Sequence, residues 1–410
     1  MFNAIWKMKE GFVSGAGLIV VGLLLQFTVG PINWSDFAFP INIIFLVLYL
    51  LSLVVIYALR QRVRLFAFLF TAEAAVPTLV YAALLTVAMG LTRQVAPYER
   101  AIDPIGLTRM LSFWPFVFIY ARLAGIVGLI ALRQILHFRL REVPSLLSHL
   151  GLFIAIVAAT LGSADMERVK LKASTDMPEW RATHEQGFTE LPLAIQLEKF
   201  TIDEYPPKLL LINSQTGKSI PAKNPEIVLV DKHFREGKLL QWRIRVRQNL
   251  PLAAPVITSD TTNYVAWGSS GAVTALLVEA QRMEGDRPVG KPQVGWVTCG
   301  SYLFPFQELK LTKELSLVMA RREPERYASR IHVYTESQKN IIATVEVNKP
   351  VTVDGWKIYQ LSYDEAMGRW SETSTFELVK DPWLPAVYVG VYLLLAGAIL
   401  TFIVSQKKRR

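Results

Sequence analysis

The sequence has one cysteine, Cys299, among 410 residues, so no internal disulfide framework can hold the fold together. Charge is also scarce, because only 19% of the residues are charged while 52% are hydrophobic. A composition this apolar does not fit an ordinary soluble protein. It predicts long hydrophobic segments.

Six long apolar runs are present. A helix rises ~1.5 Å per residue, so about 20 residues cross the hydrocarbon core of a bilayer. The runs therefore predict six transmembrane helices, of which the fifth is long enough only if it begins near Val143. The runs cover residues 11–30, 40–59, 65–91, 111–132, 146–161 and 384–404.

Basic residues lie on one side of the predicted spans. Residues 1–163 carry 12 basic and 6 acidic groups, residues 384–410 carry four basic groups, and the charges of residues 164–383 balance. By the positive-inside rule, we expect both termini in the cytoplasm and residues 164–383 outside the cytoplasmic (inner) membrane, in the periplasm. The net charge of +10 is thus a topology signal, and no nucleic-acid partner is expected.

The region between the fifth and sixth spans has the pattern of β-structure. Residues 242–247 alternate apolar and arginine side chains, which is typical of a half-buried strand. Asp354-Gly355 separates two β-rich runs and suits a two-residue type I′ hairpin turn. Residues 282–292 are rich in Gly and Pro and are interpreted as a connection.

The expected fold is therefore an α-helical membrane bundle of about six helices, with a large β-rich domain inserted before the last helix. We expect three parts: a five-helix unit at residues 1–163, an extracytoplasmic domain at 164–383, and a final helix with a basic tail at 384–410.

Three ionisable side chains lie inside the apolar runs: Glu73, Arg122 and His149. Counted from the nearest basic loop, they are about 14, 17 and 12 Å deep, so all three could meet at one level. Such groups are costly in lipid and usually face a bundle interior or a partner. One interpretation is a structural Glu73–Arg122 ion pair, with His149 bonded to a neighbouring helix. The other makes His149 an axial haem ligand and gives Arg122 to a haem propionate.

Few other residues in the sequence suggest a metal or catalytic site. His184, His233 and His332 have no metal-ligand spacing, and no Cys-x-x-Cys-His motif, nucleophile elbow or phosphate loop is present. Cys299 is interpreted as a small hydrophobic residue of the interior. The residues alone therefore do not indicate enzymatic catalysis.

Two stretches are similar to a known family. In residues 111–171, a span ending in basic residues precedes a His149-x-Gly151 helix that leads into the β-rich region. Residues 345–400 carry the second pattern. Its marked residues are Asn348, Pro350, Gly355, Tyr359, Gln360, Tyr363, Asp364, Asp381 and Pro382. Together these stretches resemble the ResB (CcsB-type) family of cytochrome c biogenesis proteins.

The resemblance implies a role in system II cytochrome c maturation together with a CcsA-type membrane partner. Such a pair is thought to move haem b, not covalently bound, to apocytochrome c as part of a cytochrome c synthase (haem lyase) complex. By motif match the haem ligand is His149, and the partner supplies the second ligand. Two alternatives stay open: a membrane electron-transfer subunit that binds b-type haem or quinone, and a non-catalytic membrane-anchored scaffold.

Overall fold

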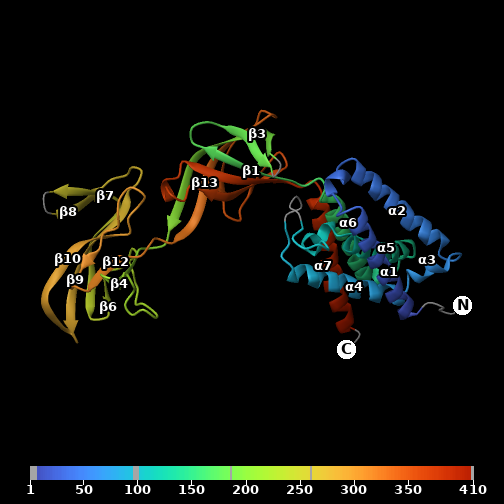
Figure 1. The fold of residues 1–410 in the computed structure, drawn as a ribbon, viewed down its shortest axis with the longest axis horizontal. Coiled ribbons are helices and arrows are strands. Elements are labelled where there is room, and N and C mark those ends of the chain that lie inside the picture. Colours follow the sequence, from blue (N-terminus) through green and yellow to red (C-terminus); the bar gives the residue numbers. More distant parts are fainter. Residues whose placement is uncertain (1–6, 96–100, 185–186, 259–260, 408–410) are drawn as a thin grey trace. The chain divides into compact units, whose positions relative to one another are not determined.

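The computed structural model describes residues 7–95, 101–184, 187–258 and 261–407. The chain forms two compact units. The first contains residues up to Glu167 and from Val379 onward, and the second contains Arg168–Leu378. Figure 1 shows helices throughout the first unit and strands throughout the second.

In the described residues of the first unit, six helices are long and apolar enough to cross a membrane. These helices, with a β-rich region between the fifth and the sixth, confirm the predicted fold class. The helices are α1 (Met8–Thr28), α2 (Ile41–Leu59), the short α3 (Arg64–Phe68), α4 (Ala72–Leu91), α5 (Trp114–Leu136), α6 (Val143–Gly162) and α7 (Leu384–Lys407). Short 3₁₀ turns are η1 (Trp34–Phe37), η2 (Leu107–Ser112), η3 (Leu140–Glu142) and η4 (Gly368–Trp370).

The third predicted span is corrected by the structure. Residues 65–91 are not one continuous helix, because the chain turns between α3 and α4. Within α4, Pro77 has no N–H, so the carbonyl of Glu73 loses its usual intrahelical partner. Gly11 of α1 packs against this carbonyl, where any side chain would collide with Glu73 and Pro77. Gly11 on α1 and Pro77 on α4 thus let these two helices approach closely.

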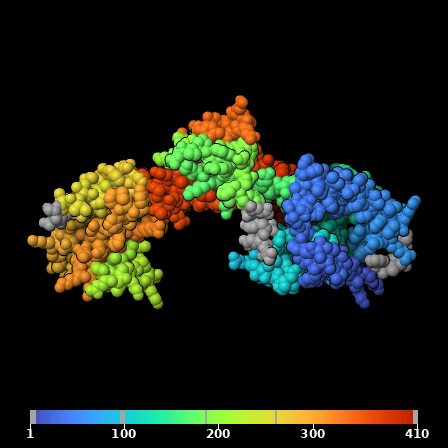
Figure 2. Space-filling model, turned by 45° about the horizontal axis from the view of Figure 1, so that its top comes forward, coloured from blue at the N-terminus to red at the C-terminus, as the bar shows by residue number. Residues whose placement is uncertain are grey.

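Helix α5 is the centre of the bundle. In its most apolar window 56% of the residues are buried, against 28% or less in the other five spanning helices. One side of α5 packs on α4 through Ala82, Ile119 and Leu123, and another packs on α6 through Val127 and Phe153. Helix α2 is peripheral, and Figure 2 shows the N-terminal helices (blue) exposed over much of the face it presents.

Helices α6 and α7 pack backbone against backbone. A methyl group at Gly390 of α7 would lie 2.6 Å from the backbone nitrogen of Ala155 and 2.8 Å from the carbonyl oxygen of Gly151 on α6. At Gly397 it would lie 2.6 Å from the backbone nitrogen of Ser148. Inside lipid no hydrophobic effect drives helices together. Small residues at such contacts allow apolar helices to associate by close packing instead.

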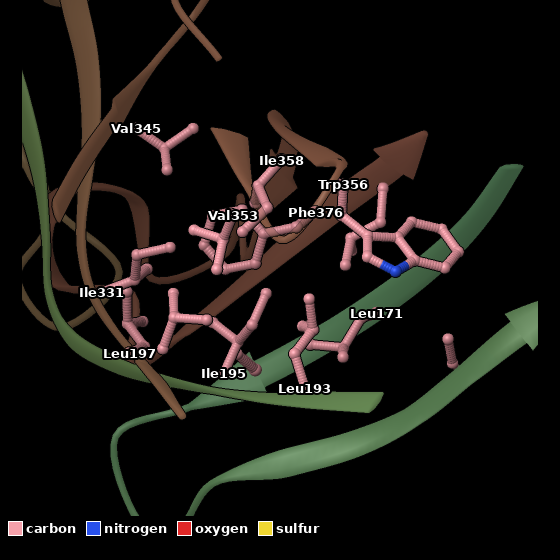
Figure 3. Packing of buried hydrophobic residues seen from close by; sticks show 14 of the residues in the cluster. Leu171, Leu193, Ile195, Leu197, Ile331, Val345, Val353, Trp356, Ile358 and Phe376 are labelled. Atoms are coloured by element: carbon pink, nitrogen blue, oxygen red, sulfur yellow. The ribbon is translucent and has the colours of Figure 1, made fainter. Parts of the chain in front are cut away.

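The second unit contains an eight-stranded sheet with the order β14-β13-β3-β2-β1-β17-β16-β15. Its buried face forms one core around Trp356 and Phe376 (Figure 3). The strands are β1 (Glu167–Ser174), β2 (Glu179–His184), β3 (Gly187–Glu204), β13 (Pro324–Thr335), β14 (Asn340–Glu346), β15 (Val351–Val353), β16 (Trp356–Tyr363) and β17 (Thr373–Lys380).

Two further sheets enclose a second core that includes Leu211, Trp242 and Val278. One sheet has the order β10-β9-β7-β6, with β8 paired to β7, and the other has the order β11-β12-β4-β5. The strands are β4 (Lys208–Asn213), β5 (Val228–Leu229), β6 (Glu236–Leu239), β7 (Trp242–Thr258), β8 (Thr261–Ala266), β9 (Val273–Glu284), β10 (Arg287–Thr298), β11 (Leu309–Lys310) and β12 (Leu315–Met319).

Two predictions for the β-rich region are confirmed in detail, and one is wrong. Asp354 and Gly355 both have positive φ, 46° and 85°, and Val353 pairs with Trp356, as a type I′ turn requires. In β7 the arginines at 243, 245 and 247 alternate with the more buried Trp242 and its apolar neighbours. Residues 282–292, by contrast, are mostly strand, because β9 and β10 extend to a tight turn at Gly285-Asp286.

Candidate functional site

His149 lies in the second turn of α6 on the side that faces α5. Its Nδ1 is 2.7 Å from the carbonyl oxygen of Ser145 and 3.2 Å from the Ser145 hydroxyl, one helical turn earlier. The residues that continue this face, Leu152 and Ile156, pack into the cluster formed by α4 and α5. The imidazole is therefore held against its own helix inside an apolar interface, and it is only partly buried.

The Ser145 hydroxyl is in turn bonded from the neighbouring helix. The side-chain amide of Gln134 on α5 donates to Ser145 Oγ at 3.0 Å. Gln134 is 8% exposed, although a polar side chain in a membrane span is costly. Gln134 and Ser145 were not predicted as site residues from the sequence. The signal that could have found them is a glutamine in an otherwise apolar turn, opposite a Ser-x-x-x-His spacing.

Arg122 lies near the middle of α5. Its Nε is buried and has no hydrogen-bond partner among the described residues. An Arg122–Glu73 ion pair was one interpretation of the sequence. The described residues contain no such ion pair. The guanidinium is therefore a donor group inside the bundle that the described side chains do not satisfy fully.

Glu73 is not deep inside a span. Because α4 begins at Ala72, Glu73 lies in the first turn of its helix, where a carboxylate complements the N-terminal end of the helix dipole. The depth of about 14 Å assumed a continuous helix from Arg64, and the break after α3 makes that count wrong. The position of Glu73 is thus explained by local helix electrostatics.

The three ionisable residues do not lie at one level. Gln134 contacts Ser145, and Gly128 lies against Phe153, so His149 is level with residue 131 of α5. Residue 131 is nine residues beyond Arg122, which corresponds to about 13 Å along the helix axis. The expectation that the three groups meet at one depth is corrected accordingly. No hydrogen bond or ion pair joins any two of them in the described parts of the chain.

At the opposite end of α6, Asp165 joins three segments. Its carboxylate accepts hydrogen bonds from the backbone N–H of Phe39, the Asn42 amide and the Trp383 indole, each at 2.7 Å. Asn42 is fully buried and also donates to the carbonyl of Leu161. Neither Asp165 nor Asn42 was predicted as a site residue, although a lone asparagine at the start of an apolar run is a signal in the sequence.

In the described residues of the second unit, no three His, Cys, Asp or Glu side chains are grouped so that they could hold a metal ion. His332 is bonded to Asn340 and Tyr334 within its own sheet. Cys299 packs against the second core, which contains Leu211, Trp242 and Val278. Burial raises the pKa of its thiol. A thiol with a raised pKa stays protonated at neutral pH, which fits a packing role.

Comparison with known families gives one match. Residues 297–374 match the model of the ResB-like family, the family of CcsB/ResB cytochrome c biogenesis proteins. No curated protein matches the chain significantly. The matched segment runs from the end of β10 into β17, so it lies in the second unit and does not include His149.

The class of protein follows from these findings together. The chain is a membrane protein with a large β-rich region that carries a ResB-like segment. The resemblance expected from the sequence is thereby confirmed over residues 297–374, and it fits a role in cytochrome c biogenesis in general.

Proposed function

We propose that this protein is the membrane subunit of a cytochrome c maturation complex that holds haem in the bilayer and presents it to apocytochrome c. Haem is here the cargo. Two independent features support the proposal: the ResB-like segment at residues 297–374 and the single histidine that lies within an apolar span. A CcsA-type protein is the partner that we propose, because proteins of this family generally work with one.

The observation that carries the proposal is the state of the His149 ring. Its Nδ1 is bonded to its own helix, whereas Nε2 has no hydrogen-bond partner among the described residues. An imidazole with one nitrogen fixed by a carbonyl and the other free is the arrangement found in histidines that bind metals. The side chains present therefore fit an axial ligand to haem iron.

Arg122 is proposed to bind an anionic group of the cargo. A guanidinium pairs well with carboxylates, and haem carries two propionates. Its buried Nε lacks a partner in the described chain, and its axial offset of about 13 Å from His149 rules out a direct contact between the two residues. Arg122 and His149 would thus hold different parts of one extended ligand.

The proposed orientation follows the basic loops. The ends of α2 and α5 and the tail after α7 carry most arginines and lysines of the membrane unit, so we propose that they face the cytoplasm. The β-rich unit then lies outside the inner membrane, where apocytochrome c is matured. There it would contact the apocytochrome or the partner.

The proposal is tested on the full chain co-expressed with a CcsA-type partner and extracted in detergent. The visible spectrum of the native complex is compared with those of His149→Ala and His137→Ala. His137 is a matched control because it ends α5 and contacts the Tyr57 hydroxyl at 3.3 Å, outside the α5–α6 interface. We expect the b-type haem spectrum to be lost in His149→Ala and kept in His137→Ala.

Maturation is measured in parallel as the amount of c-type cytochrome formed in the same cells. Loss of both haem and maturation in His149→Ala alone supports haem handling through this residue. Equal spectra and equal maturation in all three proteins would overturn the proposal. The chain would then be better described as a scaffold.

A further inference from the structure

A short chain of hydrogen bonds crosses from α5 to α6 and ends at the His149 ring. Gln134 Nε2 donates to Ser145 Oγ at 3.0 Å, and Ser145 Oγ lies 3.2 Å from His149 Nδ1. The carbonyl oxygen of Ser145 lies closer still, at 2.7 Å from the same nitrogen. Two oxygens of one residue therefore face Nδ1.

These contacts decide which ring nitrogen carries the proton. A carbonyl oxygen has no hydrogen and can only accept, so the 2.7 Å contact favours the form with a proton on Nδ1. The Gln134 amide donates to the Ser145 hydroxyl, which leaves a lone pair of that hydroxyl for the same proton. A neutral imidazole with hydrogen on Nδ1 has its lone pair on Nε2.

We propose that Gln134 and Ser145 are positioning residues that fix His149 in the Nδ1–H form and so present Nε2 as the ligand. What Nε2 binds rests on the proposed function, but the tautomer and its cause do not. The residues act through His149 and do not themselves touch the cargo.

The burial of Gln134 supports a role beyond packing. A glutamine in an apolar span costs free energy unless its polar atoms are paired, and a leucine would fill similar space without that cost. Gln134 pairs only its amide nitrogen within the described residues, because its buried Oε1 has no partner there. The one contact that it makes is the one that orders the Ser145 hydroxyl.

A consequence for the iron follows from the same bond. A hydrogen bond donated by the outer nitrogen of a ligating histidine fixes the ring and makes the inner nitrogen a stronger base. Weakening the bond should lower haem affinity and raise the reduction potential of the iron, because a stronger base favours the ferric state. Loss of such a partner typically costs about 10- to 100-fold in affinity.

The first experiment needs no haem. The full chain is labelled with ¹⁵N-histidine, and the ring signals of His149 are assigned by their absence in His149→Ala. We expect the native chain to have Nδ1 protonated and Nε2 unprotonated. Ser145→Ala and Gln134→Leu both keep the Ser145 carbonyl, so the Nδ1–H form should persist in part. The Nε2–H form should grow because Nδ1 loses its second acceptor or the ordering of that acceptor. Ser145→Thr should keep the native tautomer because the hydroxyl remains.

Ser148→Ala is the matched control. It removes a hydroxyl from the same helix, but that hydroxyl bonds the Pro144 carbonyl at 3.0 Å on the side facing α7. Its ring signals should match those of the native chain. A native Nε2–H tautomer, or unchanged ring signals in both Ser145→Ala and Gln134→Leu, would overturn the inference.

The second experiment measures haem affinity and reduction potential of the complex with its partner. We expect Ser145→Ala and Gln134→Leu to bind haem at least about tenfold more weakly and at a higher potential, with Ser148→Ala and Ser145→Thr unchanged. If the native complex holds no haem that depends on His149, the proposed function fails, and the ¹⁵N signals still decide the tautomer. If haem binding, potential and tautomer are native in both variants, the inference fails and the proposed function stands.

Discussion

The indole N–H of Trp383 donates a 2.7 Å hydrogen bond to the carboxylate of Asp165, which ties the start of α7 to the end of α6. The same carboxylate also binds Asn42 and the backbone of Phe39 at the start of α2. Three helix ends therefore share one anion. The chain enters the β-rich unit directly after Asp165 and returns directly before Trp383, so this contact closes the membrane unit where the insertion begins and ends.

The Asp165 contact predicts a loss of stability at acid pH. Burial raises the pKa of the Asp165 carboxyl, but the hydrogen bonds from Trp383, Asn42 and Phe39 outweigh it and hold the pKa below its ordinary value. A lowered pKa in the folded state means that the contribution is present above the unfolded pKa of about 4 and is lost as the pH falls further. Asp165→Asn should remove this dependence and lower the free energy of unfolding by about 1–3 kcal/mol at pH 7.

Thermal unfolding of the detergent-solubilised chain between pH 3 and pH 7 measures both effects. Asp176→Asn is the control, because Asp176 is exposed on the loop between β1 and β2. An Asp165→Asn variant that melts at the native temperature at pH 7 would show that the carboxylate does not hold the helix ends.

The α6–α7 contact predicts a strict limit on side-chain size. Gly390→Leu should destabilise the membrane unit by about 1–3 kcal/mol or more, because the added side chain meets the backbone of Ala155 and Gly151 rather than a movable side chain. Gly17→Leu on α1 is the matched control, since a Cβ there meets no atom within 4 Å. Melting temperature and resistance to proteolysis in detergent give the comparison. Equal stability of the two variants would contradict the close packing.

Much of the fold can be predicted from the sequence because periodicity and length carry it. Apolar runs of about 20 residues give the helices, and the Asp354-Gly355 pair gives a type I′ turn because both positions need positive φ. The break between α3 and α4 could not be found this way. Residues 65–91 stay apolar through the turn, and hydropathy does not distinguish a turn buried in a bundle from a continuous helix.

The candidate site is predicted only in part, for a similar reason. His149 stands out because an imidazole in an apolar run is rare. Its level relative to Arg122 depends on how far α5 and α6 slide past each other, and their sequences do not fix that register. The roles of Gln134 and Asn42 depend on hydrogen-bond partners outside their own helices. Spacing along one helix shows which residues share a face but not what that face meets.

The second unit contains a nearly buried ion pair whose loss should be costly. Arg322 lies 3.6 Å from Glu204, and their side chains are 13% and 16% exposed. Arg322 also donates to the carbonyl of Tyr205 and to the Thr274 hydroxyl, so it joins β9 to the end of β3. Arg322→Met should destabilise the chain by about 1–3 kcal/mol. The Tyr205 carbonyl and the Thr274 hydroxyl lose their donor, and Glu204 keeps only Arg369, also at 3.6 Å, as a charge partner.

Arg330→Met is the matched control for this pair. Arg330 contacts Glu198 at 2.8 Å, but both side chains are about half exposed, so the loss should be below about 1 kcal/mol. Chemical denaturation of the full chain, followed by tryptophan fluorescence, measures the difference. Similar midpoints for the two variants would show that the Arg322 contacts add nothing beyond a surface pair.

Cys299 should react slowly in the native protein. Burial raises the pKa of its thiol, and the sulfur lies 3.6 Å from the Gly300 carbonyl oxygen at the edge of a packed core. Each unit by which the pKa rises lowers the reactive thiolate fraction about tenfold at neutral pH, and limited access slows alkylation further. Maleimide labelling of the native chain should therefore be at least about tenfold slower than labelling after denaturation, and it should speed up with rising pH. Because the chain has no other cysteine, Cys299→Ser gives the blank. Rapid labelling at pH 7 would mean that the thiol is an accessible thiolate, and a redox role for this residue would have to replace the packing role.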